Sequence, residues 1–301
     1  MKILITGSSG FIGQHLIQRL SSHEIVLFDC DLRDHDATRQ CVKSANPDVI
    51  IHLAALTEVE HSFYQQALFS DVNYTGTVNL VESAREAPNL KLFLFSSTME
   101  TYGWQPISDK IKNNEPFDHA PFDETTIQHP NAPYAVAKLG CEKYLEYASR
   151  AYNLPYCILR QTNTYGRTDN DFFVVEQIIT QMLKGDTVNL GYAKPYRNFL
   201  HISDLINAYI AILSNVSAVK NETFCVGPNN ALSIEKLAEI CAKKLGWQGD
   251  INWDTKPERA GEIYYLNSTN DKITSTIGWE PLIDLDTGLD MTIEFWKNAL
   301  N

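Results

Sequence analysis

The sequence has little positive charge. Its 301 residues include 25 lysines and arginines against 37 aspartates and glutamates, which gives a formal net charge of −12 at pH 7. A polyanion repels nucleic acid and anionic membrane surfaces, so we expect neither as a partner. An anionic small molecule could bind only where a few arginines create local positive charge against the field of the whole protein.

The sequence also lacks paired cysteines and long apolar runs. Its six cysteines are scattered and none forms a CxxC pair, so we expect no metal site. No apolar run approaches the ~20 residues needed to cross a bilayer. A glycine turn interrupts the first apolar run, unlike a signal peptide. We therefore expect a cytoplasmic protein with reduced cysteines, most of them small core residues.

What the sequence does contain is a strand, a glycine turn and a helix at its start. The apolar residues Ile3 to Ile5 lead into Gly7, Gly10 and Gly13, and an amphipathic run follows. In this arrangement the first glycine permits the turn, the second lets backbone approach phosphate, and the third lets the helix pack closely on the strand. A pyrophosphate then lies over the helix N-terminus. The segment predicts a dinucleotide-binding site.

The end of the second expected strand bears on the choice of dinucleotide. Asp29 follows this strand, where a carboxylate accepts hydrogen bonds from the adenosine ribose and favours NAD over NADP. Asp31 and Leu32 come at once and a further helix soon after, so the usual intervening helix and third strand are missing. We expect a sheet shortened at this edge, with these three residues around the adenosine. Arg33 could instead meet a 2′-phosphate, which keeps NADP as an alternative.

Further strands alternate with helices along the chain. The apolar run Pro47–His52 predicts a buried parallel strand, and small Ala54 and Ala55 leave room for a flat ligand at its end. A helix follows, on which Asn73 is expected near the nicotinamide, and residues 91–98 predict the next strand. This alternation predicts an α/β fold of the Rossmann type, with a doubly wound parallel sheet.

Hydroxyl groups and a lysine form a candidate catalytic set. Ser96, Ser97 and Thr98 close a strand, whereas Tyr134 and Lys138 lie four residues apart and share a face on a helix. An ammonium beside a phenol lowers the pKa of the phenol towards neutrality. Thr98 can hold a substrate hydroxyl by a hydrogen bond. Together these groups can deprotonate a sugar alcohol while a nicotinamide accepts the hydride.

Motifs over almost the whole chain resemble those of the extended short-chain dehydrogenases, specifically the NAD-dependent nucleotide-sugar epimerase/dehydratase family. The matching segments are residues 6–13, 52–55, 73–77, 96–98, 102–103, 134–138, 159–166, 197–204, 259–262 and 282–296. The resemblance implies Thr98, Tyr134 and Lys138 as a catalytic triad. It also implies a nucleotide-diphosphate sugar as the substrate and NAD as the cofactor.

The resemblance further implies residues that bind each ligand. On the substrate side these are Thr98, Met99, Asn163, Arg197 and Arg259, and the arginine forks suit a diphosphate. On the cofactor side the implied residues are Gly7, Ser9, Gly10, Phe11, Ile12, Gly13, Asp29, Asp31, Leu32, Leu53, Ala54, Ala55, Asn73, Ser96, Tyr134 and Lys138.

Glu100 bears on the type of reaction. The segment Thr98-Met99-Glu100 resembles the sugar-nucleotide 4,6-dehydratases and the decarboxylase and apiose-forming branches, in which the glutamate works next to C5. Oxidation of C4 to a ketone acidifies the C5 proton, and a nearby carboxylate can remove it. The best-known hexose dehydratases carry an Asp where this chain has Met99, which cannot donate a proton to a leaving hydroxyl. A structural role for Glu100 is the alternative.

Two parts of the chain are expected to form the enzyme. A dinucleotide-binding domain takes residues 1–165, with 201–226 returning to it. A small mixed α/β C-terminal lobe, which binds the substrate, takes 166–200 and 227–301. The polar, proline-dotted stretch between residues 103 and 134 predicts a loop that partly covers the sugar.

Three functions remain open from the sequence. The first is an NAD-dependent epimerase or dehydratase that transiently oxidises C4 of a nucleotide sugar, as a plain 4-epimerase or with Glu100 as the C5 base. The second is an NADPH-consuming reductase of a 4-keto sugar. The third is a non-enzymatic cofactor-sensing protein, against which the presence of Tyr134 and Lys138 argues. Aromatic residues on the helices at 71–86 and 135–152 favour a homodimer, as is common in the family.

Overall fold

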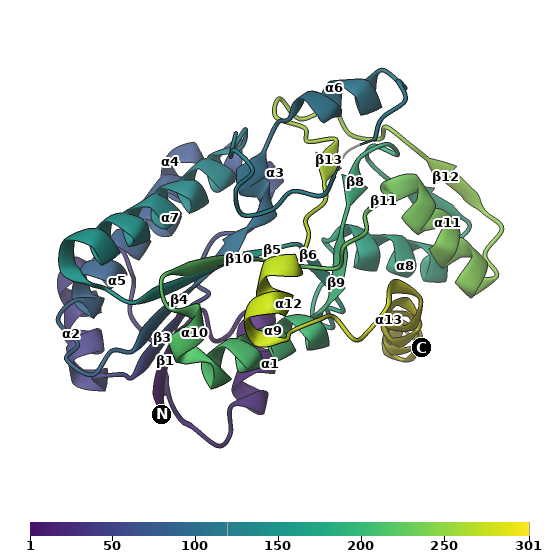
Figure 1. The fold of residues 1–301 in the computed structure, drawn as a ribbon. Coiled ribbons are helices and arrows are strands. Elements are labelled where there is room, and N and C mark those ends of the chain that lie inside the picture. Colours follow the sequence, from purple (N-terminus) through teal and green to yellow (C-terminus); the bar gives the residue numbers. More distant parts are fainter. Residues whose placement is uncertain (119, 301) are drawn as a thin grey trace.

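The computed structural model describes residues 1–118 and 120–300 and shows a parallel sheet covered on both faces by helices, with a smaller mixed lobe beside it (Figure 1). Six strands lie in the order β10-β5-β4-β3-β1-β2. Their bounds are β1 Lys2–Thr6, β2 Glu24–Leu27, β3 Val49–His52, β4 Leu92–Thr98, β5 Tyr156–Gln161 and β10 Glu222–Val226. The predicted α/β fold with a doubly wound parallel sheet is confirmed.

The central strands are apolar because helices bury both of their faces. In β1, Ile3 and Ile5 pack into one core, and Leu4 between them packs into the core on the opposite face. The helices of the first face are α1 Phe11–Arg19, α9 Ile202–Ser214, α10 Val216–Val219 and α12 Asp271–Ile277. The helices of the second face are α2 His35–Ala45, α5 Gly76–Ala84 and α7 Pro133–Tyr152.

The sheet ends at β2, as the sequence predicts. Among the described residues no strand pairs with the outer edge of β2, and α2 begins shortly after it. The side chain of Asp34 caps α2 by accepting a hydrogen bond from the backbone N–H of Ala37 at 3.0 Å. The short connection between β2 and α2 therefore carries Asp31 and Leu32.

Short helices occupy the connections above the sheet. They are α3 Val59–Ser62, α4 Gln66–Phe69, the π-helix η1 Ser70–Thr75, the 3-10 helix η2 Met99–Tyr102 and α6 Pro106–Lys112. The prediction of a loop between residues 103 and 134 is wrong at α6, where the chain is helical. Pro106 suits the first helical turn, and Ile107 and Ile111, four residues apart, bury in a cluster that includes Tyr265.

The smaller lobe has its own core between helices α8 Val174–Lys184, α11 Ile234–Leu245 and α13 Leu285–Leu300 (Figure 1). Its strands are β6 Asn163–Tyr165, β7 Thr187–Asn189, β8 Tyr196–Arg197, β9 Phe199–His201, β11 Leu232–Ser233, β12 Asp250–Asn252 and β13 Tyr265–Leu266. Ile273 and Trp279 pack into the core of the large sheet instead, so part of the segment 227–301 lies outside this lobe. The domain boundaries otherwise stay a prediction.

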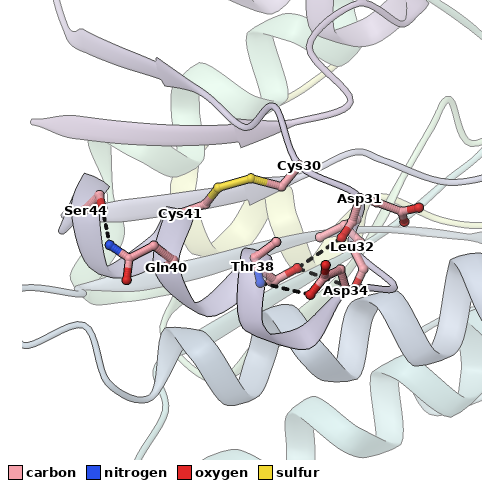
Figure 2. The surroundings of a disulfide bond; sticks show 9 residues. Cys30, Asp31, Leu32, Asp34, Thr38, Gln40, Cys41 and Ser44 are labelled. Carbon is pink, nitrogen blue, oxygen red and sulfur yellow. Dashed lines mark hydrogen bonds between the residues drawn. A yellow bond between two sulfur atoms is a disulfide. The ribbon is translucent and has the colours of Figure 1, made fainter.

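Cys30 and Cys41 form a disulfide bond between the loop after β2 and helix α2 (Figure 2). The expectation of reduced cysteines is therefore wrong for this pair. The two are 11 residues apart in a spacing that matches no motif, and only the return of α2 alongside the loop brings them together. The four free thiols are buried, at Cys141, Cys157, Cys225 and Cys241.

None of the helices within residues 1–118 and 120–300 is long and apolar enough to cross a membrane. The same residues contain no group of three or more histidine, cysteine, aspartate or glutamate side chains that could hold a metal ion.

Candidate active site

A cavity of about 640 Å³ lies at the carboxyl ends of the sheet strands, a volume typical of small-molecule sites. The glycine turn, the ends of β3 and β4, the start of α7 and the segment 161–176 line it. The residues predicted from the sequence that line it are Gly7, Ser9, Gly10, Phe11, Ile12, Gly13, Leu53, Ala54, Ala55, Thr98, Met99, Glu100, Tyr134 and Asn163. The fold therefore brings distant predicted segments into one site.

The glycine turn leaves no room for side chains. Gly7 has a φ of +68°, and a Cβ atom there would lie 2.6 Å from the backbone nitrogen of Ala54. A Cβ atom on Gly13 would overlap the carbonyl oxygens of Gly7 and Ser8. The N–H of Gly10 donates to the Gly7 carbonyl at 3.1 Å and closes the turn. The helix α1 thus begins directly under the cavity, as a pyrophosphate site requires.

The residues predicted around the adenosine lie at the sheet edge, outside the residues that line the cavity. Asp29 and Asp31 are exposed, whereas Leu32 is buried. The guanidinium of Arg33 donates to the carboxylate of Asp31 at 2.6 and 3.0 Å, and this hydrogen bonding lowers the pKa of Asp31 to about 2. The Arg33 fork is thus engaged by an acid, which weakens the case for a bound 2′-phosphate.

Asn73 and Ser96 lie behind the cavity wall. The amide of Asn73 accepts from the backbone N–H of Leu56 at 2.8 Å and donates to its carbonyl at 2.9 Å. These bonds fix the loop after β3, and the contact between Asn73 and nicotinamide stays a prediction. The carbonyl of Ser96 accepts from the Lys138 ammonium at 2.7 Å, and its hydroxyl accepts from Gln161 at 2.7 Å.

Tyr134 and Thr98 both face the cavity, from the start of α7 and the end of β4. Burial raises the pKa of the Tyr134 phenol, Glu100 raises it further, and hydrogen bonding with Thr98 lowers it. The Thr98 hydroxyl also accepts from the backbone N–H of Glu100 at 3.2 Å. The phenol is protonated at neutral pH in this setting, so additional positive charge nearby is needed before it can act as a base.

Lys138 lies one helical turn after Tyr134. Its ammonium is 6.0 Å from the centroid of the Tyr134 ring and 4.8 Å from that of Phe95. Burial lowers the pKa of Lys138 to about 8. The expected lowering of the phenol pKa is wrong here, because burial of Tyr134 and the charge of Glu100 raise this pKa by more than hydrogen bonding with Thr98 lowers it.

Glu100 faces two arginines that share a second glutamate. Glu262 accepts from Arg259 at 2.7 and 2.9 Å and from Arg197 at 3.4 Å, and this trio carries one net positive charge. Burial raises the pKa of Glu100, Arg197 and Arg259 lower it, and Glu262 raises it again. Both arginines lie outside the residues that line the cavity, close to Glu100.

Met99 and Asn163 complete the predicted substrate residues. The Met99 side chain is buried, and its sulfur accepts from the Ser268 hydroxyl at 3.3 Å. Asn163 begins β6 and is exposed at the cavity. The thioether cannot supply a proton, so the prediction that Met99 lacks acid function follows from its chemistry alone.

A buried ion pair anchors the catalytic helix to the sheet. The guanidinium of Arg160 on β5 donates to the Glu142 carboxylate at 2.8 Å, and Glu142 is fully buried. The Ser97 hydroxyl also donates to Glu142. Since Glu142 follows Lys138 by one turn of α7, this network holds the helix that carries Tyr134 against the strand that carries Thr98.

Most of the cavity wall formed by residues 161–176 was not predicted from the sequence. Its lining residues are Gln161, Thr162, Thr164, Tyr165, Arg167, Asp169, Asn170, Phe172, Phe173, Val174, Val175 and Glu176, and Thr57, Glu58 and Val59 join them from the loop after β3. An arginine next to Gly166, followed by two phenylalanines, was the signal that could have identified this wall.

Comparison with known proteins gives consistent results. The model of the NAD dependent epimerase/dehydratase family matches residues 3–227. The UDP-glucose 4-epimerase of Mycolicibacterium smegmatis is 28% identical over 99% of this chain and 99% of its own. The dTDP-glucose 4,6-dehydratase of Shigella flexneri is 27% identical over 100% of this chain and 94% of its own. The crystal structure of UDP-glucose 4-epimerase with UDP-glucose from Thermotoga maritima has a TM-score of 0.86, with 27% identity and full coverage of both chains.

Proposed function

The chain belongs to the NAD dependent epimerase/dehydratase family, and from this premise we propose that it binds NAD and transiently oxidises C4 of a nucleotide-diphosphate sugar, with Glu100 as the base at C5. The observation that carries the proposal is that Thr98, Glu100 and Tyr134 line one cavity together with the glycine turn. A cofactor on the turn and a sugar against the tyrosine would then meet in the same space.

The residues of the first βα unit fit a dinucleotide. The backbone cradle at Gly7 and Gly13 would be filled by a Cβ atom, and α1 offers its N-terminal N–H groups beyond it. Asp29 at the end of β2 suits the ribose hydroxyls of NAD, while Arg33 is held by Asp31. NAD bound there supplies a hydride acceptor and a positive charge close to the tyrosine.

The side chains around the sugar would divide the proton chemistry. Thr98 orients the C4 hydroxyl, and Tyr134 removes its proton. The Lys138 ammonium, fixed by the Ser96 carbonyl, stabilises the phenolate that forms. Because burial raises the pKa of the phenol, deprotonation depends on the positive charge that surrounds it in the loaded site.

Glu100 supports chemistry beyond the oxidation of C4. Glu100 lies on η2, directly after Met99, and lines the same cavity. Burial raises its pKa above the ordinary value, which makes its carboxylate a stronger base than an exposed one. A C5 proton acidified by the C4 ketone is a suitable target. Since Met99 cannot protonate a leaving hydroxyl, another group or water would do so in a 4,6-dehydratase.

Replacement of Tyr134 by phenylalanine tests the proposal. We expect Tyr134→Phe to keep NAD binding while the turnover number falls by about 10²- to 10⁴-fold. Turnover would be measured by mass spectrometry with UDP-, dTDP-, GDP- and CDP-sugars, and NAD binding by calorimetry. Tyr64→Phe is the matched control because Tyr64 is 75% exposed. Full turnover by Tyr134→Phe would contradict the proposed mechanism.

A plain 4-epimerase is the second candidate function, since two of the similar proteins are named UDP-glucose 4-epimerases. Such an enzyme returns the hydride to the opposite face of C4 and leaves C5 untouched. Product analysis separates the two candidates, because the C5 proton exchanges with solvent only if Glu100 acts as a base. A reductase would instead oxidise NADPH stoichiometrically when a 4-keto sugar is added.

A further inference from the structure

Arg167 lies between two aromatic rings that belong to different parts of the fold. Its guanidinium carbon is 4.4 Å from the ring centroid of Phe11 and 3.5 Å from that of Phe173. Phe11 is the first residue of α1, immediately after Gly10, whereas Phe173 directly precedes α8 of the smaller lobe. Both distances are within the range of cation–π contacts. The arginine therefore connects the glycine turn to the lobe across the cavity.

The backbone at Arg167 is held in place by a buried acid. The Glu176 carboxylate in the first turn of α8 accepts from the N–H groups of Gly166 and Arg167 at 2.8 and 2.9 Å. Gly166 has a φ of +99°, so the sharp turn there requires a glycine. The guanidinium itself donates to the Thr164 carbonyl. The side chain is thus presented to the cavity by a rigid turn.

The charges around the cavity make this arginine unusual. Among the described residues that line it, Arg167 is the one lysine or arginine, and Glu58, Glu100, Asp169 and Glu176 are acidic. The expected cofactor brings two negative phosphates to the N-terminus of α1, where Phe11 stands. In a protein with a net charge of −12, a pyrophosphate needs a local cation, and Arg167, stacked on Phe11, is the lining residue that can supply it.

We propose that Arg167 is a cofactor-binding residue, whose guanidinium, stacked between Phe11 and Phe173, binds the NAD pyrophosphate from the side opposite the glycine turn. This inference rests on the proposed function, since it presumes NAD in the cleft. A guanidinium fork suits phosphate oxygens, and the stacking leaves its edge free to meet them. Because Arg167 lies in the segment between β6 and α8, a contact with the cofactor would also hold this segment against the cavity.

The test is the affinity for NAD and for adenosine, which lacks the pyrophosphate. We expect Arg167→Met to raise the Kd for NAD by about 10- to 100-fold, the loss typical of one charge-assisted hydrogen bond, and to leave adenosine binding unchanged. Arg167→Lys keeps the charge but loses the fork and the stacking, so a smaller loss is expected. Arg39→Met is the control, because Arg39 pairs with Glu86 away from the cavity.

Calorimetric titration of each purified variant, after removal of any retained nucleotide, gives these constants, and circular dichroism checks folding. Unchanged NAD affinity in a folded Arg167→Met protein would overturn the inference, as would a parallel loss of adenosine affinity, which indicates a structural role. If Arg167→Met does not fold, Phe173→Leu replaces it, and it should weaken NAD binding alone by removing one stacking face. Failure of the wild type to bind NAD would instead overturn the proposed function.

Discussion

At the scale of single residues, burial governs the titration of the catalytic groups. It raises the pKa of Tyr134 and of Glu100, and it lowers the pKa of Lys138 to about 8. All three shifts favour the neutral form, as desolvation does. The Tyr134 phenol is therefore protonated in this setting, and its ionisation is coupled to whatever positive charge the ligands bring.

Lys138 should give the enzyme an alkaline limit. The ammonium is charged below its pKa of about 8 and neutral above it, so stabilisation of the Tyr134 phenolate is lost as the pH rises through that value. We expect Lys138→Met to lower kcat by about 10²-fold and to abolish this fall. The measurement is kcat from pH 6 to 10 for the wild type, Lys138→Met and Lys138→Arg.

The arginine variant separates charge from the other properties of the lysine. An arginine stays charged across this range, so the fall should move to higher pH in Lys138→Arg. A fall that keeps its midpoint in Lys138→Met would show that another group causes it.

The proposed role of Glu100 can be tested at the C5 proton of the substrate. We expect Glu100→Gln, which keeps the shape of the side chain, to lower solvent exchange at C5 by at least about 10²-fold. Nuclear magnetic resonance in deuterated water measures that exchange. Tyr134→Phe is the control, since without the C4 ketone the C5 proton is not acidified and exchange should vanish. Equal exchange in the wild type and Glu100→Gln would assign Glu100 a structural role.

At the scale of elements, the local sequence pattern predicted most strands and helices but not the segments against which they pack. The cap at Asp34 joins residues three positions apart, whereas the two cores on either side of β1 combine segments that lie far apart in the chain. Helix α6 was missed because its polar, proline-containing sequence is typical of a loop, and only the burial of Ile107 and Ile111 against Tyr265 makes it a helix. The bond between Asn73 and Leu56 was not predicted because it joins residues 17 positions apart that only the tertiary fold brings together.

The Cys30–Cys41 bond should stabilise the segment that follows β2. It closes a short loop between the expected adenosine site and α2 (Figure 2). In the chain-entropy account, a loop of this size contributes about 3 kcal/mol to the free energy of unfolding. We expect Cys41→Ser to lose about this amount under oxidising conditions, measured by urea denaturation.

Reduction provides the control for the disulfide. With dithiothreitol in excess, the wild type should fall to the stability of Cys41→Ser, and Cys30→Ser should match Cys41→Ser in both conditions. Thiol titration would show that dithiothreitol has reduced the disulfide. An unchanged free energy of unfolding of the reduced wild type would then contradict the contribution assigned to this bond.

At the scale of the whole molecule, the sequence predicted the sheet and the cavity because chain order determines them. Parallel strands end at one edge, so the glycine turn, Ala54 and Thr98 had to meet there. The opposite wall could not be predicted from periodicity. Arg167 and Phe173 reach the cavity through the turn at Gly166 and the placement of α8, which depend on the packing of the smaller lobe.

The exposed apolar residues of one face predict a homodimer. Val136 and Tyr147 on α7, Tyr74 on η1 and Tyr64 nearby are between 37% and 75% exposed, and Tyr74 packs directly against Gly140 of α7. Exposed apolar side chains that gather on neighbouring elements are typical of an interaction site. We therefore expect the protein to pair through α7 and η1, with sedimentation velocity showing a species of about twice 34 kDa.

A charge placed in this patch should separate the subunits. Val136 is 55% exposed, and Val136→Glu would bury two carboxylates across a two-fold contact, raising the dimer dissociation constant by at least about 30-fold. Leu282→Glu is the matched control, because Leu282 is 81% exposed but lies outside α7 and η1, and it should leave the dimer intact. A folded Val136→Glu protein that stays dimeric would place the interface elsewhere, and a monomeric wild type at micromolar concentration would contradict the dimer itself.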